Sequence, residues 1–233
     1  MANEVKKVNT IAIADIEAIN TITDDNLQAL NTLEFSGTPA DAHTWIATVT
    51  SDGSDATLGF VDGTGGVVLD NTYDVYEFHF INIKPETNAS ILAFQVDVVD
   101  GTTYGQPITS TTFEAEHDEA DSGNDLQYRT NRDQHNGTEY QQLSEYIYNG
   151  VGDESASGIL TLFAPSSGTY IKHWMSVVNA YGNATTQVSY HGGYINQTSA
   201  IDRIRFAMTA NDPATLQDDI TSGTIKMYGL ATS

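Results

Sequence analysis

Alternation of apolar and polar residues with a period of two is the strongest pattern in this 233-residue chain. That period is typical of β-strands with one buried face, and the stretches between are rich in turn-forming Gly, Pro, Asn and Asp. The sequence predicts an all-β fold, an antiparallel β-sandwich or jelly roll. Eight segments carry the pattern: 43–50, 73–83, 90–99, 158–164, 170–178, 186–194, 201–208 and 223–230.

The segment 73–83 also predicts which side chains face the core. One of its two alternating sets has the larger apolar content and is expected to point inward. This set consists of Asp74, Tyr76, Phe78, Phe80 and Asn82. A short helix is compatible only with residues 139–150 and 212–220.

Residues 1–35 differ from the remainder, because they contain a four-residue phrase that recurs every eleven residues. The copies begin at Val8, Ile19 and Leu30. An eleven-residue period suits a right-handed helical supercoil, yet the repeated Asn-Thr pairs are weak helix formers. We therefore predict short extended pieces that alternate with helical turns and are too small to fold alone.

The chain is thus divided into an N-terminal attachment or oligomerisation segment, residues 1–35, and a β-sandwich domain, residues 36–233. The apolar side chains of the first segment are predicted to form an assembly interface. They are Val8, Ile11, Ile13, Ile16, Ile19, Ile22, Leu27, Leu30 and Leu33.

Charge excludes several classes of partner. The chain has 31 acidic and nine basic residues, a formal charge of −22, which repels phosphate backbones and anionic lipid surfaces. No segment reaches the roughly 20 apolar residues that span a bilayer, and the N-terminus has no signal-peptide pattern. We expect no nucleic acid, no membrane insertion and synthesis in a cytoplasm.

Catalytic and metal-binding motifs are absent from the sequence. There is no cysteine, no Gly-x-Ser-x-Gly elbow, no His-Glu-x-x-His pair and no phosphate-binding loop. The six histidines have no metal-ligand spacing, and His79 and His173 are expected to be structural residues within strands. The prediction is a protein that is not an enzyme and has no cofactor and no metal site.

Two surface features have alternative interpretations. The acidic run 114–125 has oxygen ligands suited to Ca²⁺, but its spacing does not match a calcium loop, so a mobile, solvated loop is predicted. Tyr181, Tyr190 and Tyr194 are candidate glycan contacts, since tyrosine rings stack on sugars. Tyrosine on a strand is more often explained by β packing.

Three stretches resemble structural proteins of marine tailed phages, cyanophages in particular. The opening "VKKVNTIAIADIEAINTI…LNTLEF" resembles their N-terminal repeats, and "GILTLFAPSSGTYIKHW" is similar to their middle strands. The ending "SAIDRIRFAM…ITSGTIKMYGL" is similar to the closing hairpin of phage virion and tail-associated β domains.

The resemblance implies a bacteriophage virion protein, either an exterior capsid decoration or fibre or a component of a tail fibre. The protein would be made in the host cytoplasm and would bind other capsid or tail proteins through residues 1–35. A homo-oligomer is implied, a trimer being one arrangement. The alternative is a carbohydrate-binding or receptor-binding adhesin that attaches to a host surface glycan.

Overall fold

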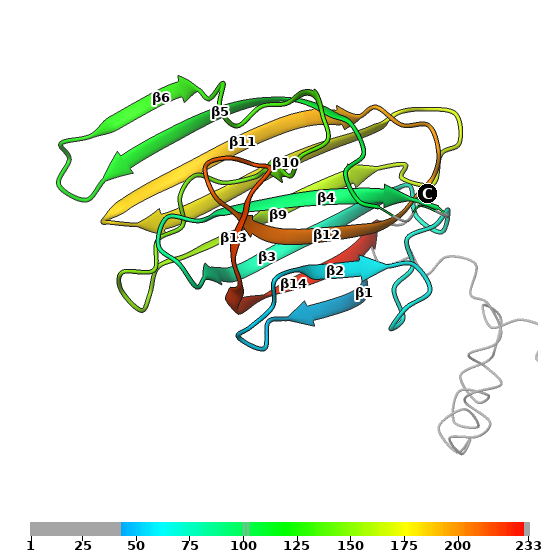
Figure 1. Ribbon diagram of the computed structural model, residues 1–233, viewed down its shortest axis with the longest axis horizontal. Helices are drawn as coiled ribbons and strands as arrows, with labels where there is room; N and C mark the ends of the chain where they lie inside the picture. Colours follow the sequence, from blue (N-terminus) through cyan, green and yellow to red (C-terminus); the bar gives the residue numbers. More distant parts are fainter. Residues whose placement is uncertain (1–42, 100, 102, 231–233) are drawn as a thin grey trace, which may run out of the picture. The chain divides into compact units, whose positions relative to one another are not determined.

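The computed structural model describes residues 43–99, 101 and 103–230, and within them two antiparallel sheets form a sandwich (Figure 1). The larger sheet has nine strands: in spatial order β1 (His43–Thr50), β14 (Ile220–Leu230), β3 (Val75–Pro85), β9 (Ser155–Phe163), β10 (Lys172–Gly182), β11 (Thr185–Ile195), β5 (Ile108–Asp118) and β6 (Asn124–Tyr128), with β7 (His135–Gly137) also paired to β5. The smaller sheet has five: β13 (Leu216–Asp218), β12 (Ile201–Thr209), β4 (Ile91–Val98) and β8 (Gln141–Gln142), with β2 (Leu58–Val61) paired to β12. The predicted antiparallel β-sandwich is confirmed.

All eight predicted segments form strands, and their ends lie within a few residues of the predicted ones. The strands that the pattern missed are β2, β5, β6, β7, β8 and β13. Residues 139–150 and 212–220 contain β8 and β13 and are not helical, so the helical option is wrong. The described residues include no helix long and apolar enough to cross a membrane.

The C-terminal strands do not form the hairpin expected from the resemblance. β12 pairs with β13, β4 and β2 in the smaller sheet, whereas β14 pairs with β1 and β3 in the larger sheet. The chain therefore crosses from one sheet to the other after β13. This crossing places β12 and β14 on opposite sides of the core.

The core between the sheets is built around phenylalanine rings. Tyr76, Phe78 and Phe80 are buried, as the alternation predicted. Phe206 of β12 packs on both phenylalanines of β3, with ring centroids 5.6 Å from Phe78 and 5.1 Å from Phe80. The rings meet at tilted or edge-to-face angles, the arrangement that aromatic quadrupoles favour. This cluster joins the two sheets.

Strands β5 and β6 extend beyond the area of the smaller sheet, as Figure 1 shows. Part of the inward face of β5 packs instead on the segment 129–145, which contributes buried polar residues: Arg132, Gln141, Gln142, Ser144 and Glu145. The sandwich interior is therefore apolar in the middle and polar beneath β5 and β11.

Strands β10 and β11 are joined by a tight hairpin. Asn183 and Ala184 form the two-residue loop, and both have positive φ angles, 52° and 58°. Two successive positive φ values define a type I′ turn, whose twist matches that of the paired strands. The turn holds the ends of both strands in strict register.

Candidate functional site

The nine apolar residues predicted as an assembly interface, Val8 to Leu33, lie outside the described residues. The candidate sites that the structure offers are therefore on the sandwich. They are one face of the larger sheet and a small cavity near the β10–β11 hairpin.

The face of the nine-stranded sheet that is directed away from the smaller sheet is here called the outer face. All three tyrosines predicted as glycan contacts project from it, Tyr181 on β10 and Tyr190 and Tyr194 on β11. Tyr181 is paired with Thr186, so the three side chains recur every four residues, or about 13 Å, along the strands. The structure thus brings them onto one surface without direct contact.

An apolar row crosses the outer face at the level of Tyr190. The register aligns side chains from five neighbouring strands, β9, β10, β11, β5 and β6. The rings of Phe113 and Tyr190 are stacked, with centroids 4.8 Å apart and an interplanar angle of 8°. The row consists of Ile159, Val177, Tyr190, Phe113 and Tyr128, each between 37% and 54% exposed.

Most of the large exposed apolar side chains of the described residues gather on this face. Of thirteen, nine project from outward strand positions, and exposed apolar clusters of this kind mark interaction surfaces. The nine are Trp45, Ile81, Phe113, Leu126, Tyr128, Ile159, Met175, Val177 and Tyr190.

The charge of the outer face is unlike that of the whole chain. Among the outward positions of the described strands of the larger sheet, Glu77 is the one acidic residue, and Lys84 and Lys226 are the basic ones apart from histidine. Five of the six histidines of the chain are also there: His43, His79, His117, His135 and His173. The face is nearly neutral while the protein carries −22.

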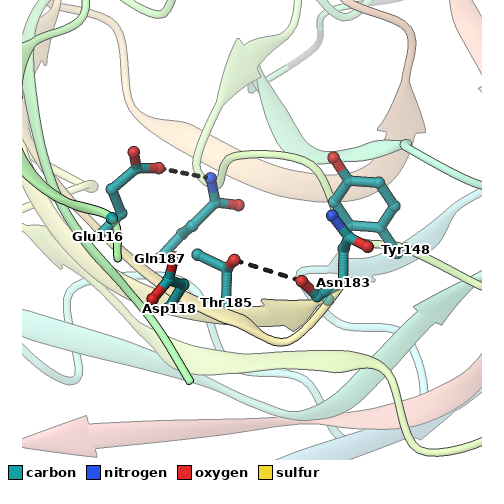
Figure 2. A pocket seen from close by; sticks show the side chains of 8 residues that line it. Glu116, Asp118, Tyr148, Asn183, Thr185 and Gln187 are labelled. Atoms are coloured by element: carbon teal, nitrogen blue, oxygen red, sulfur yellow. Dashed lines mark hydrogen bonds between the residues drawn. The ribbon is translucent and has the colours of Figure 1, made fainter. Parts of the chain in front are cut away.

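A cavity of about 140 Å³ lies at the end of β5 and β11 (Figure 2). Figure 2 shows Glu116, Gln187 and Asp118 on one side of it, and Tyr148 and Asn183 on the other. Gln187 Nε2 donates to Glu116 Oε2 at 3.2 Å. The lining therefore offers one aromatic ring, two amides and two carboxylates in a small volume.

The acidic run 114–125 is a β-hairpin and not a loop, although Glu119, Asp121 and Asp125 are solvent-exposed as predicted. Glu114, Glu116 and Asp118 lie on the inward side of β5. Ser122 donates from its backbone and its hydroxyl to Asp118, and these bonds lower the pKa of that carboxyl. No group of three or more His, Asp or Glu residues in the described part is placed to hold a metal ion.

Beneath β5, two arginines and two glutamates form a buried network. Arg132 Nε and Nη2 donate to the two carboxylate oxygens of Glu145 at 3.0 and 2.8 Å. Arg129 Nε donates to Glu145 Oε1 at 2.7 Å and lies 2.9 Å from Glu114 Oε2. The network is enclosed, which makes its role structural: it holds the segment 129–145 against β5.

Two buried groups near this network have shifted pKa values. Burial and the nearby Glu145 carboxylate raise the pKa of Glu114 to about 8. Burial lowers the pKa of His191 to about 4, and its Nδ1 lies 2.9 Å from Thr112 Oγ1. At neutral pH the folded protein therefore holds a protonated Glu114 and an uncharged His191.

Stability is expected to fall as pH rises from about 6.5 to about 8. The unfolded chain loses the Glu114 proton near its ordinary pKa of 4.5, whereas the folded chain keeps it until about 8. His191 acts in the opposite direction only between about 4 and 6.5. Thermal unfolding of Glu114→Gln should show a dependence on pH that is flatter by roughly 1 kcal/mol per pH unit in that range. Equal slopes for both proteins would contradict the assignment.

Lys172 is another buried charged residue without a catalytic partner. Its Nζ donates to backbone carbonyls of two loops at the same end of the sandwich. Burial lowers its pKa. The lysine ties the loops together, and its four acceptors are Ser167, Tyr170, Gln197 and Thr198.

Sequence reasoning missed most of the apolar row and the cavity. Ile159, Val177 and Phe113 are far apart in the chain, and only the register of four strands makes them neighbours. The sequence does contain one signal of it. Segments 158–164 and 170–178 have apolar residues at both odd and even positions, which indicates that both faces of these strands are apolar.

No protein-family model, curated protein or solved structure matches this chain.

Proposed function

We propose that the chain is an exterior structural protein of a tailed-phage virion, a capsid decoration or fibre or a tail-fibre component. It acts by assembly and surface presentation and catalyses no reaction. The observation that carries the proposal is the gathering of exposed apolar side chains on one broad, nearly neutral face of an acidic protein. Such a surface suits contact with protein.

Two further features support this function. The phage-like opening and ending lie at the two ends of the chain, and the ending supplies β12 and β14, one strand for each sheet. The phage-like ending therefore forms part of the core of the sandwich. The buried charged groups are enclosed by structural partners, and this agrees with a role that needs no catalysis.

Immunogold labelling tests the proposal. Antibodies against the sandwich are applied to intact particles purified from an infected host culture. The expected result is regular labelling of the particle exterior, together with peptides of this chain in the purified particles. Particles that contain none of the protein, or bind antibody only after disruption, would show that the proposal is wrong.

Glycan binding is a second candidate function, favoured by the cavity of Figure 2. Its volume of about 140 Å³ suits one sugar ring. Tyr148 offers a ring for stacking, and the amides and carboxylates can bind sugar hydroxyls. On the outer face, by contrast, Tyr190 has one ring face covered by Phe113. The cavity is therefore the better glycan site, and Tyr181 and Tyr194, which project from the opposite face of the sheet, are separate from it.

Asn183→Gly is expected to lower glycan affinity about tenfold, the effect of losing roughly 1.4 kcal/mol of hydrogen bonding. Glycine tolerates the positive φ of this position, so the turn is kept while the amide is removed. Ala184→Gly is the matched control, since it changes the same turn without changing a lining residue. A glycan array provides the readout. If no glycan binds the unaltered protein, this candidate is wrong.

A further inference from the structure

We propose that the outer face is the surface through which two copies of this chain associate. The inference rests on the proposed function, because it names the partner of that surface. A second copy presents the same face, so the contact would be two-fold symmetric.

The area of the face is sufficient for a stable dimer. Eight strands spaced about 4.8 Å apart give a width of about 34 Å, and the eleven-residue strands are about 36 Å long. The face thus covers about 1,200 Å², whereas a standard interface buries about 800 Å² on each partner. The apolar row Ile159, Val177, Tyr190, Phe113 and Tyr128 runs across one half of this area.

Charge favours this face over the rest of the surface for self-contact. Two chains that each carry −22 repel one another. At the outward strand positions of the outer face, the charged residues apart from histidine are Glu77, Lys84 and Lys226, a formal sum of +1. The nearest acids with contacts to the face are at its rim, where Asp133 accepts from the Tyr128 hydroxyl and Asp121 lies 3.3 Å from His117 Nε2. Face-to-face contact therefore brings together the least charged parts of two acidic molecules.

The composition of the row favours protein over sugar as the occupant. Ile159, Val177 and Phe113 have no hydrogen-bonding group in their side chains, whereas a sugar needs polar partners for its hydroxyls. Apolar and aromatic side chains without charge are typical of the buried centre of protein interfaces. A second copy supplies a surface of the same chemistry.

Five histidine rings lie on this face, beside carboxylate and aromatic side chains. His43 and His79 lie 3.1 and 2.9 Å from the same oxygen of Glu77, and both rings also lie against Tyr228. His117 is next to Asp121. His173 lies against Tyr194, and His135 is opposite Thr109 in the register.

Sedimentation velocity of the full chain over a range of concentrations tests the proposal. Val177→Glu places a carboxylate in the apolar row, and Leu216→Glu is its matched control on β13, because both side chains are 44% exposed. The expected result at about pH 7.5 is dimers for the unaltered protein and the control, and at least tenfold weaker association for Val177→Glu. Ile159→Glu, on the neighbouring strand, should behave like Val177→Glu. Thermal melts verify that each variant is folded.

A monomer at about 100 µM and pH 7.5 would overturn the proposal, as would dimers of the Val177→Glu and Ile159→Glu variants equal to those of the unaltered protein. If the protein is monomeric but is labelled on virions, the proposed dimer interface is wrong and the proposed function stands. If the protein is dimeric but absent from virions, the proposed function is wrong and the dimer interface stands.

Discussion

Replacing Arg132 with methionine is expected to lower the free energy of unfolding by about 3–5 kcal/mol. The guanidinium is buried, donates twice to Glu145 and donates through Nη1 to Gln142 and Asn211. Methionine fills much of the same volume but makes none of these bonds. Glu145 would keep only Arg129 as a charged partner in an enclosed site, and a buried charge with lost partners is costly.

Urea denaturation measures the effect, with Arg203→Met as the control. Arg203 pairs with its neighbour Asp202 at 2.9 Å, but both side chains are partly exposed. Pairs of that kind contribute less than about 1 kcal/mol. Similar losses for the two variants would show that the network beneath β5 is not important for stability.

Phe206→Ala is expected to lower the free energy of unfolding by about 3–5 kcal/mol. The Phe206 ring is fully buried and contacts Phe78 and Phe80, so its removal leaves a cavity between the two sheets. The surrounding rings belong to a rigid strand in the middle of the larger sheet and can collapse into the space only partly. The change should therefore cost more than the lost transfer free energy alone.

Phe113→Ala provides the matched control, because its ring is 46% exposed on the outer face. The expected loss of stability is at most about 1 kcal/mol. The midpoints of urea denaturation give both losses of stability, provided that the free energy of unfolding has the same slope against urea concentration in each protein. If Phe113→Ala were as destabilising as Phe206→Ala, the outer face would be part of the folding core and its apolar row would need no partner.

The strands that could be predicted are those in which the period-two pattern was clear. Segment 73–83 predicted β3 and the inward direction of Tyr76, Phe78 and Phe80, because alternate side chains of a strand must point to opposite faces. The same reasoning failed for β5, whose inward positions include Glu114, Glu116 and Asp118. These acids resembled a solvated loop because their partners come from other segments or from the turn itself: Arg129 for Glu114, Gln187 for Glu116 and Ser122 for Asp118.

The candidate site was predicted only in part. Tyr181, Tyr190 and Tyr194 do share one face. Tyr190 and Tyr194 are four residues apart on β11, and the pairing of β10 with β11 places Tyr181 on the same side. Their neighbours could not be found in advance, since Phe113 and Val177 come next to Tyr190 only through the order β10–β11–β5. Strand order depends on long connections and on the packing of the whole core, which no local pattern records.

By itself, the sequence determined the class of fold, the strand segments with regular alternation and the strongly acidic charge, because these depend on local spacing and composition. Only the tertiary structure decided which strands are neighbours, and with them the apolar row, the gathering of five histidines and the exclusion of all outward acids but Glu77. The physical reason is that a sheet surface is made across strands by backbone hydrogen bonds between distant segments. Its chemistry therefore exists only once the register has formed.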